Sequence, residues 1–564
     1  MVLYGRSELL TALSVLLLAG TAPEAAIAGD SATAARPADL EAQADALLAE
    51  VYPADGPGGA VIVTRRGRVV YAAGRGLADI QGKRRITPDT PFQLGSITKQ
   101  FTAAMVLQLV AEGKISLEDP ISRFFPGFPE PSARATVRQL LNHTSGIQDY
   151  SKIPGWLVRE GARPHSTAEL VAEVRNRPGK AEPGRSWEYN NAGYMMLGAI
   201  VEQATGKSWY EAVSDRIARP LGLTTVRYGA SAEAERAKAR GYALRDGRQV
   251  PAAGAHPSLA HAAGGLTASV RDLAKWAQAL HHGKVVGPAS YREMTSPARL
   301  ADGSARPYGF GLRLQTFLGR PAFVHGGAAR GVDTDSLYIP SEDLYVAVLA
   351  NTEDAPMDSS TVSRRIAAVA LGDPIPTFRR ADVPLASIEP LFGAYQAEGA
   401  PPLSFFSRNG KFYLASGEQE LEAIPAGGDR FYFGPDRLMW IRFLRGPDGA
   451  SILEMHEPER ARPERAVRTG AVPPPILVPA AVLQSYVGTY QTETVAVTVA
   501  LAEGGGLTIQ ANDGPVMPMR PVSQTEFRVD TARLRLVFNP ENGKVNRLTL
   551  YRGARELHGQ RAAR

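Results

Sequence analysis

The chain has 564 residues, 44% of them hydrophobic and 21% charged, with a formal net charge of +6 and no cysteine. The absence of cysteine excludes disulfides, thiol catalysis and thiolate metal sites, and the thinly spread charge gives nucleic-acid binding no support. The length exceeds one ordinary core, so roughly three or four domains are expected of a soluble globular protein.

The first residues have the pattern of an export signal. Arg6 precedes an apolar run over residues 9–20, and a small-residue site follows at residues 26–28. This pattern predicts a cleavable signal peptide over residues 1–28 and a periplasmic or secreted protein. The apolar run is short for a bilayer span, so we expect no integral membrane span after cleavage, with a single anchor as the alternative.

Three elements are predicted in the next part of the chain. Residues 39–52 carry apolar side chains at helical spacing. Two β-branched runs around Arg66 and Gly67 predict a β-hairpin. Residues 96–112 have the pattern of a strong amphipathic helix that Gly113 ends.

The middle of the chain alternates between helical patterns and loops rich in proline and glycine, from about residue 115 to residue 300. Strand patterns then return in "AFVHGG", "DSLYIP" and "LYVAVLAN", and the helical pattern "SRRIAAVALG" follows them. Strands therefore occur on both sides of a helical insert. This arrangement predicts one sheet that is built from both ends of the region.

The C-terminal part reads as a linker over residues 373–382 followed by short alternating runs that are typical of all-β domains. It also repeats itself, which predicts two small antiparallel β-barrel domains over residues 383–470 and 478–564. We expect them to serve as packing or lid elements. The matching pairs are Gly393 and Gly488, Tyr395 and Tyr490, Phe443 and Phe538, and Gly449 and Gly543.

A possible nucleophile lies in the stretch "FQLGSITKQF". Ser96 and Lys99 are three residues apart, so a helix places both side chains on one face. A serine at the start of a helix lies where partial positive charge favours an anion. Burial or a nearby cation lowers the pKa of a lysine amine and lets it act as a base. The structural alternative is a helix-capping serine beside an exposed lysine.

Two downstream motifs supply partners for this pair. Tyr189 and Asn191 precede an apolar helix, where the hydroxyl can relay a proton and the amide can hold both the lysine and a substrate amide. His325 follows a predicted strand and can orient the tyrosine or bind a substrate acid group. Gly326 and Gly327 let a substrate backbone approach the strand closely. Helix-entry chemistry and a simple turn are the structural alternatives.

The order Ser-x-x-Lys, Tyr-x-Asn and His-x-Gly resembles the penicillin-recognising serine hydrolases of the class C β-lactamase and D-Ala-D-Ala carboxypeptidase type. The phrases "LLNHTSGI", "YNNAGYMMLGAIVE", "AAGGLTASVRDLAKW" and "YGFGL" support the likeness, which covers residues 38–372. The resemblance implies a catalytic domain with the α+β fold of that family, an α/β sandwich. The two small antiparallel β-barrel domains would follow it.

The resemblance also implies roles for individual residues. Ser96 would be the acylated nucleophile, and Lys99 and Tyr189 would share the general-base and general-acid work. Asn191 would contact the substrate, and the backbone N–H groups of Ser96 and Ala328 would form the oxyanion hole. The strand that lies along the substrate would comprise His325, Gly326 and Gly327. No cofactor and no metal is implied.

The third motif departs from true β-lactamases, which generally have Lys-Thr-Gly where this chain has His325-Gly326-Gly327. It resembles instead the D-aminopeptidases, which also carry two C-terminal β-barrel domains. We therefore expect an aminopeptidase or amidase for small D-amino-acid peptides or amides, or an esterase. A β-lactamase or DD-carboxypeptidase is the alternative within the enzymes. A periplasmic penicillin-binding or ligand-sensing protein is the alternative outside them.

Further residues are weaker candidates. A barrel loop recognises the substrate amino group in the D-aminopeptidases, so Asp513 or Asp530 is a candidate for that role, with an exposed turn aspartate as the alternative. Arg330 is a candidate for binding a substrate carboxylate, or is a surface arginine. His143 can simply close the apolar helix before it. The expected partners are a small-molecule or short-peptide substrate and a possible second copy of the chain.

Overall fold

The computed structural model describes residues 37–562 apart from a set of short gaps. The predicted signal peptide, Asp513 and Asp530 lie outside the described residues. Within the described helices, none combines the length and the apolar character that a membrane crossing requires. The gaps are residues 154, 417–418, 447–450, 472–477, 493–494, 503–504, 513, 530–533, 542–543 and 553–554.

The first region is built on a six-stranded antiparallel sheet in the order β12-β13-β14-β15-β1-β2. Strands β1 and β2 form the predicted hairpin, and Arg66 and Gly67 between them have φ angles of 51° and 71°. Strands from both ends of the region meet where β1 pairs with β15, which confirms the predicted sheet. The strands are β1 (Gly59–Arg65), β2 (Arg68–Arg75), β12 (Arg313–Phe317), β13 (Arg320–Ala329), β14 (Val332–Ile339) and β15 (Leu344–Ala350).

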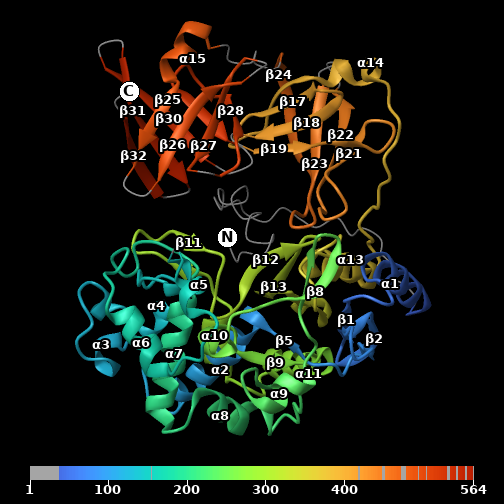
Figure 1. Cartoon of the computed structure of the whole chain (residues 1–564). Coiled ribbons are helices and arrows are strands. Elements are labelled where there is room, and N and C mark those ends of the chain that lie inside the picture. The colour runs from blue at the N-terminus through green and yellow to red at the C-terminus, as the bar shows by residue number, and fades with distance from the viewer. Residues whose placement is uncertain are drawn as a thin grey trace. The chain divides into compact units, whose positions relative to one another are not determined.

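The two faces of this sheet pack against different helices because side chains alternate along each strand. Val61 and Val63 belong to a core with the two helices from the ends of the region, α1 (Pro37–Val51) and α13 (Ser359–Leu371). Ala60 and Ile62 belong to the core of the opposite face, which holds the helical insert. Figure 1 shows the sheet between these layers.

The helical insert and its short strands connect β2 to β12. Its helices are α2 (Thr98–Ala111), α3 (Ile121–Phe124), α4 (Val137–Leu141), α5 (Trp156–Glu160), α6 (Thr167–Arg175), α7 (Asn191–Thr205), α8 (Trp209–Val213), α9 (Ala232–Ala237), α10 (Pro257–Gly264), α11 (Val270–His281) and α12 (Pro288–Met294). Its short strands are β3 (Leu77–Asp79), β4 (Arg84–Arg85), β5 (Phe92–Gln93), β6 (Arg227–Tyr228), β7 (Tyr242–Arg245), β8 (Arg248–Pro251), β9 (Leu266–Ala268), β10 (Ala298–Arg299) and β11 (Ala305–Arg306).

Helix α2 differs from the prediction. The sequence pattern predicted a strong amphipathic helix over residues 96–112, and a helix is present there, but residues 98–107 and Leu109 are all buried. The helix contacts α7 and α10, so its polar side chains are enclosed as well. Gln100, for example, accepts a hydrogen bond from the indole N–H of Trp276 at 3.0 Å. The predicted helix is thus present, but it lacks an exposed polar face along residues 98–107, and α2 is a central helix.

Between residue 372 and residue 385 the chain has no helix or strand, and this stretch contains the predicted linker over residues 373–382. An antiparallel sheet of nine strands follows, and then a closed barrel. The edge strands of the nine-stranded sheet, β19 and β20, are consecutive in the chain, and the N–H of Ala423 between them bonds to the carbonyl of Phe412. This sheet is therefore nearly closed. The predicted fold class, an α/β sandwich followed by two small antiparallel barrels, is confirmed.

The bounds of these C-terminal elements are as follows. The first barrel comprises α14 (Leu385–Ile388), β16 (Gly393–Gln396), β17 (Leu403–Arg408), β18 (Lys411–Ser416), β19 (Gln419–Glu422), β20 (Ile424–Pro425), β21 (Arg430–Tyr432), β22 (Trp440–Arg445), β23 (Ser451–His456) and β24 (Glu464–Gly470). The second comprises α15 (Ala480–Tyr486), β25 (Gly488–Gln491), β26 (Ala496–Leu501), β27 (Leu507–Ala511), β28 (Met517–Pro521), β29 (Glu526–Val529), β30 (Leu534–Glu541), β31 (Lys544–Arg552) and β32 (Arg555–Arg561).

The internal repeat has a structural counterpart in each barrel. The hydroxyl of Tyr395 donates to the carbonyl of Leu391 at 2.6 Å, and the hydroxyl of Tyr490 donates to the carbonyl of Tyr486 at 2.8 Å. Both tyrosine rings contact the matching phenylalanine of their own core. The repeated sequence therefore specifies the same tyrosine packing twice. Gly449 and Gly543 lie outside the described residues.

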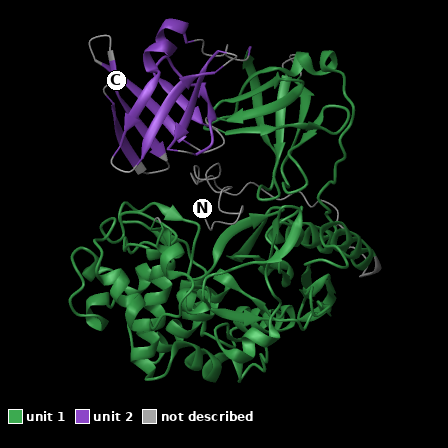
Figure 2. Cartoon of the chain, in the orientation of Figure 1, with its two compact units in different colours: residues 1–470 green, residues 471–564 purple. Residues whose placement is uncertain are grey.

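The chain divides into two compact units, the first ending at Gly470 and the second beginning at Ala471 (Figure 2). The first unit contains the region built on the six-stranded sheet and also the nine-stranded sheet, and the second contains the closed barrel. Each barrel has its own hydrophobic core.

Candidate active site

Ser96 lies in a short 3-10 turn, Gly95–Ile97, that leads directly into α2. Two glycines let this turn approach strand β13. A Cβ at Gly95, which has a φ angle of 55°, would lie 2.8 Å from the backbone nitrogen of Ala328. A Cβ at Gly327 would lie 2.9 Å from the backbone nitrogen of Ser96. The predicted oxyanion-hole amides are thus brought together, and glycine is required on both sides of the contact.

Strand β13 presents an edge beside Ser96. Its pairing with β12 ends where Arg313 lies opposite Val324. Residues 325–329 continue only in the ladder with β14 in the described part of the sheet. A strand segment with one unpaired edge can accept an extended substrate by backbone hydrogen bonds. This arrangement agrees with the role expected of the His325-Gly326-Gly327 segment.

Lys99 is completely buried, and its amine faces three oxygen atoms. The Nζ atom lies 3.0 Å from the Oγ of Ser96, 2.8 Å from the Oδ1 of Asn191 and 2.8 Å from the carbonyl oxygen of Ala263. It also lies over the rings of Tyr189 and Tyr194, at 4.7 Å and 5.4 Å from their centroids. The structure therefore brings Ser96, Tyr189 and Asn191 together around Lys99, and the sequence analysis had singled out all four residues.

The orientation of the Asn191 amide follows from its second partner. The Oγ of Ser151 donates to the carboxylate of Asp149 at 2.6 Å, so it must accept from the Nδ2 of Asn191 at 3.4 Å. The Oδ1 of Asn191 then faces Lys99 as an acceptor only. Asp149 also accepts the backbone N–H of Asn191 at 2.8 Å.

This orientation decides what Lys99 can do. The Asn191 Oδ1 and the Ala263 carbonyl can only accept, so they take two of the amine hydrogens. In a neutral amine the remaining lone pair then points to the Ser96 hydroxyl. In an ammonium ion the third hydrogen goes there instead. The geometry thus suits an amine that takes up and returns the serine proton.

The Ala263 carbonyl is available because α10 breaks immediately before it. His261 has φ and ψ angles of 38° and −132°, far from helical values. The carbonyls of the next two residues leave the helix, and they accept from Thr102 at 2.7 Å and from Lys99. A strained backbone of this kind is common beside functional sites.

Tyr189 is held in the segment before α7 by two cations. The Nζ of Lys152 donates to its backbone carbonyl at 2.5 Å. The guanidinium of Arg313 lies over its ring, 5.4 Å from the centroid. Neither Lys152 nor Arg313 was predicted, because no local motif contains them and only the fold brings them here.

His325 is buried and neutral. Burial first, and then the charges of Arg313 and Lys99, hold the pKa of its imidazole well below the usual value. Its Nδ1 faces the carbonyl of Gly326 at 2.7 Å and so carries the hydrogen, which leaves Nε2 to accept from the Tyr308 hydroxyl at 2.9 Å. The hydroxyl that His325 holds is therefore that of Tyr308 and not that of Tyr189, the tyrosine it was expected to orient. The centroid of the His325 ring lies 6.1 Å from that of the Tyr189 ring.

The remaining predicted residues are placed as follows. Arg330 is half-buried in the turn between β13 and β14, where Gly254 lies beside its Cβ. His143 lies against Tyr189, with ring centroids 4.4 Å apart. Among the described residues, no cluster of three or more histidine, aspartate or glutamate side chains could hold a metal ion.

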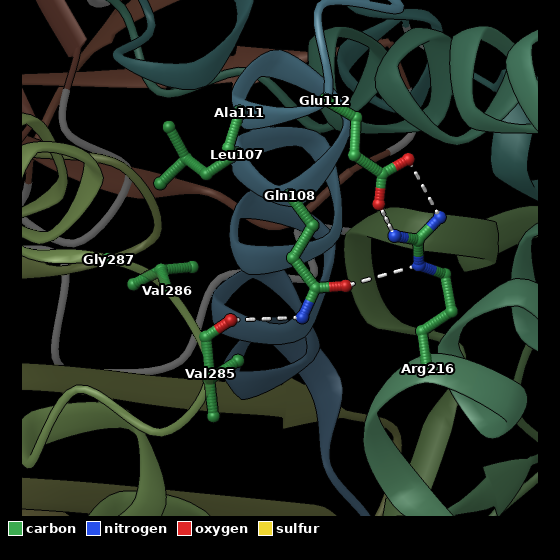
Figure 3. A pocket seen from close by; sticks show the side chains of 8 residues that line it. All are labelled: Leu107, Gln108, Ala111, Glu112, Arg216, Val285, Val286 and Gly287. Carbon is green, nitrogen blue, oxygen red and sulfur yellow. Dashed lines mark hydrogen bonds and ion pairs between the residues drawn. The ribbon is translucent and has the colours of Figure 1, made fainter.

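A separate cavity of about 450 Å³ lies beside the far end of α2 (Figure 3). Gln108 donates to the carbonyl of Val285 and accepts from Arg216, which also pairs with Glu112. These polar groups satisfy one another. The residues that line the cavity include none of those around Ser96.

A family profile named Beta-lactamase matches residues 45–371. The chain is 29% identical over 500 residues to a D-aminopeptidase of Gluconobacter oxydans, a match that covers 85% of this chain and 88% of that protein. It is 30% identical to a D-aminopeptidase of Brucella anthropi over 57% of this chain and 60% of that protein.

A solved structure is also similar. An octameric penicillin-binding protein homologue from Pyrococcus abyssi superposes with a TM-score of 0.54 at 26% sequence identity. The match covers 76% of this chain and 99% of that chain.

Proposed function

The chain belongs to the Beta-lactamase family of serine hydrolases, and from that premise we propose that it hydrolyses small amides or peptides of D-amino acids, or esters, through an acyl-enzyme on Ser96. Two similar proteins named D-aminopeptidases support this substrate class. The arrangement around Lys99 supports Ser96 as the nucleophile.

The first half of the reaction forms the acyl-enzyme. The Oγ of Ser96 attacks the carbonyl carbon of the substrate, and its proton passes to the amine of Lys99, which lies 3.0 Å away. The N–H groups of Ser96 and Ala328 then hold the oxyanion, and loss of one such donor typically costs about 10²–10³ in rate. The C–N bond breaks, the leaving amine takes the proton, and the acyl group remains on Ser96.

The second half regenerates the enzyme. A water molecule attacks the acyl carbon and gives its proton to the same base, which passes that proton to the Oγ of Ser96 as the ester bond breaks and the acid leaves. We assign Tyr189 to proton transfer at the leaving group, because its ring lies beside Lys99. Asn191 holds Lys99 and orients the substrate amide.

One observation carries this proposal: two obligate acceptors fix the Lys99 amine so that its third position faces Ser96. Hydrolysis of D-alanine p-nitroanilide, its L-enantiomer and a short p-nitrophenyl ester tests it, with Ser96→Ala as the control. We expect turnover of the D-anilide above the L-anilide and none by the variant. Absence of turnover with all three substrates would sink the proposed substrate class.

A second candidate function is a DD-carboxypeptidase, which cleaves a peptide that ends in a free carboxylate. The observation that favours it is Arg313, whose guanidinium lies over the Tyr189 ring and supplies the charge that neutral His325 does not. D-Ala-D-Ala and its C-terminal amide distinguish the two functions, because only the carboxypeptidase prefers the free acid. Turnover of nitrocefin would indicate a β-lactamase instead.

Export and assembly are further proposals. We propose that residues 1–28 direct the chain to the periplasm or medium, on the sequence pattern alone. N-terminal sequencing of the protein recovered from a periplasmic extract tests this. We also propose a homo-oligomer, which the octameric homologue supports. Sedimentation velocity over a range of concentrations tests it.

A further inference from the structure

His143 is a buried histidine that the proposed reaction does not use. It is 2% exposed and follows the end of α4, with a φ angle of 66°. The left-handed conformation is unfavourable for a residue other than glycine. Such a residue is retained only where the surrounding contacts require it.

The sequence allowed a simple role for His143, which was to close the preceding helix. The structure gives that role to its neighbours. The N–H of Asn142 bonds to the carbonyl of Arg138, and the N–H of Thr144 bonds to the carbonyl of Gln139. The imidazole of His143 points elsewhere, toward residues 188–190.

His143 binds the chain on both sides of Tyr189. Its carbonyl accepts the N–H of Glu188 at 3.0 Å, and its Nδ1 accepts the N–H of Asn190 at 3.2 Å. Its ring packs on the ring of Tyr189 between these two bonds, with centroids 4.4 Å apart. Because Lys152 holds the carbonyl of Tyr189, the backbone is fixed on every side of this residue.

The charge state of the ring is also set. Since Nδ1 accepts a hydrogen bond, the hydrogen of the neutral ring is on Nε2, which is buried and has no hydrogen-bond partner in the described part of the chain. Burial first, and then the charge of Lys99, hold its pKa well below the usual value. An unpaired buried donor destabilises the folded state, so stability alone does not favour histidine here.

From these contacts we infer that His143 is a positioning residue that sets the place of the Tyr189 phenol relative to Lys99 and Ser96. The inference rests on the proposed role of Tyr189 in acyl transfer. The Nδ1 acceptor carries most of the effect, because it ties down the backbone between Tyr189 and Asn191. The ring supplies a surface against which the phenol packs.

Three variants separate these contributions. His143→Asn keeps an acceptor at the position of Nδ1 and tolerates the left-handed backbone. His143→Phe keeps the ring and loses the acceptor, and His143→Ala loses both. His281→Phe is the matched control, because it makes the same change at a half-buried histidine that stacks on Tyr338 and lies outside the proposed machinery.

The first measurement is kcat and KM with the D-anilide, together with the melting temperature. For His143→Phe and His143→Ala we expect kcat to fall about 10²-fold, the lower end of what general acid–base catalysis contributes, with KM changed less than about threefold. His143→Asn should recover most of kcat, and His281→Phe should keep it. Full activity of His143→Phe, or no recovery by His143→Asn, would overturn the inference.

A double-mutant cycle with Tyr189→Phe gives the decisive readout. If His143 acts through the Tyr189 hydroxyl, His143→Phe costs less than about twofold once that hydroxyl is absent. Equal losses in both backgrounds would show a general structural role and reject the inference. Should His143→Phe not fold, His143→Ala enters the same cycle.

Crystal structures of the variants test the positioning without any turnover. We expect the Tyr189 ring to move in His143→Phe and to stay in place in His143→Asn, and an unmoved ring in both would contradict the inference. This readout separates the two claims, because a wild-type chain without hydrolase activity rejects the proposed function alone.

Discussion

Lys99 shows how single side chains make this site. Its amine is buried with no exposed surface, and burial of a charge is tolerated only when acceptors surround it. The Asn191 amide and the Ala263 carbonyl provide them, and Ser96 completes the set. Asp149 and Ser151 in turn fix the Asn191 amide. Burying the amine costs stability, but the contacts that make burial possible also direct the amine toward Ser96.

The first prediction concerns Lys99→Met. Methionine has a similar length and needs no acceptors, so we expect the melting temperature to stay the same or to rise. Loss of the base should lower the rate of Ser96 labelling by a fluorophosphonate by about 10²–10⁴-fold. Thermal unfolding and labelling kinetics measure the two effects. An unchanged labelling rate would show that Lys99 is not the base.

The second prediction concerns Gly327→Ala, with Gly326→Ala as the matched control. A Cβ at Gly327 would lie 2.0 Å from the Leu94 carbonyl and 2.9 Å from the Ser96 nitrogen, so β13 must move away from the nucleophile. We expect kcat to fall about 10²–10³-fold, as for loss of an oxyanion-hole donor. At Gly326 the nearest atom would lie at 3.2 Å, so the loss should be smaller. Equal losses in kcat would contradict this account.

Sequence reasoning found the residues of the site that carry local motifs. Lys99 lies within hydrogen-bond reach of both Ser96 and Asn191, as expected. Arg313 and Lys152 could not be found in this way, because only tertiary contacts bring them to Tyr189. A pattern of apolar and polar residues contains no information about such pairs.

The sequence pattern predicted where helices and strands occur better than it predicted whether their polar residues face water or the protein interior. The hairpin around Arg66 and Gly67 and the sheet from both ends of the region formed as expected. Helix α2 formed as well, but its polar residues face other helices through internal hydrogen bonds rather than water. Periodicity records polar positions, but it does not distinguish water from a buried partner.

Helix α11 supplies the third prediction through its last residue, His281. The ring stacks on Tyr338 at 3.8 Å between centroids, and Nδ1 lies 2.7 Å from the Tyr291 hydroxyl. Burial, with a smaller effect of His282, lowers the pKa of His281 to about 3. The folded protein therefore binds fewer protons than the unfolded chain between about pH 6.5 and pH 3.

The free energy of unfolding keeps the full contribution of His281 above pH 6.5 and loses about 1.4 kcal/mol per pH unit as the pH falls below it. His281→Phe lacks this loss. Urea denaturation of both proteins at pH 8 and pH 5 should show the variant gaining about 2 kcal/mol relative to wild type. A difference that is independent of pH would contradict the assignment.

The whole molecule consists of two compact units, and the closed barrel forms the second by itself. Its core includes Phe527 and Tyr490 and is separate from the core of the nine-stranded sheet. The sequence predicted two similar barrels from the repeat. It did not predict that the first barrel belongs to the same compact unit as the region built on the six-stranded sheet, because this depends on tertiary packing.

The fourth prediction follows from this division. Phe527→Ala removes a buried ring from the barrel core, a change that typically costs about 3–5 kcal/mol. Because the barrel is a separate unit, calorimetry should show one thermal transition lowered and the other unchanged. Tyr395→Phe, which loses the hydrogen bond to Leu391, should lower only the other transition. A single transition that both variants shift would contradict two independent units.

The central claim is that Ser96 becomes acylated. Incubation of the full chain with a fluorophosphonate, followed by intact mass and peptide mapping, tests it most directly. We predict one phosphonyl group per chain, located on the peptide that contains Ser96, and no label on Ser96→Ala. A label on any other residue, or an unmodified wild-type chain, would contradict it.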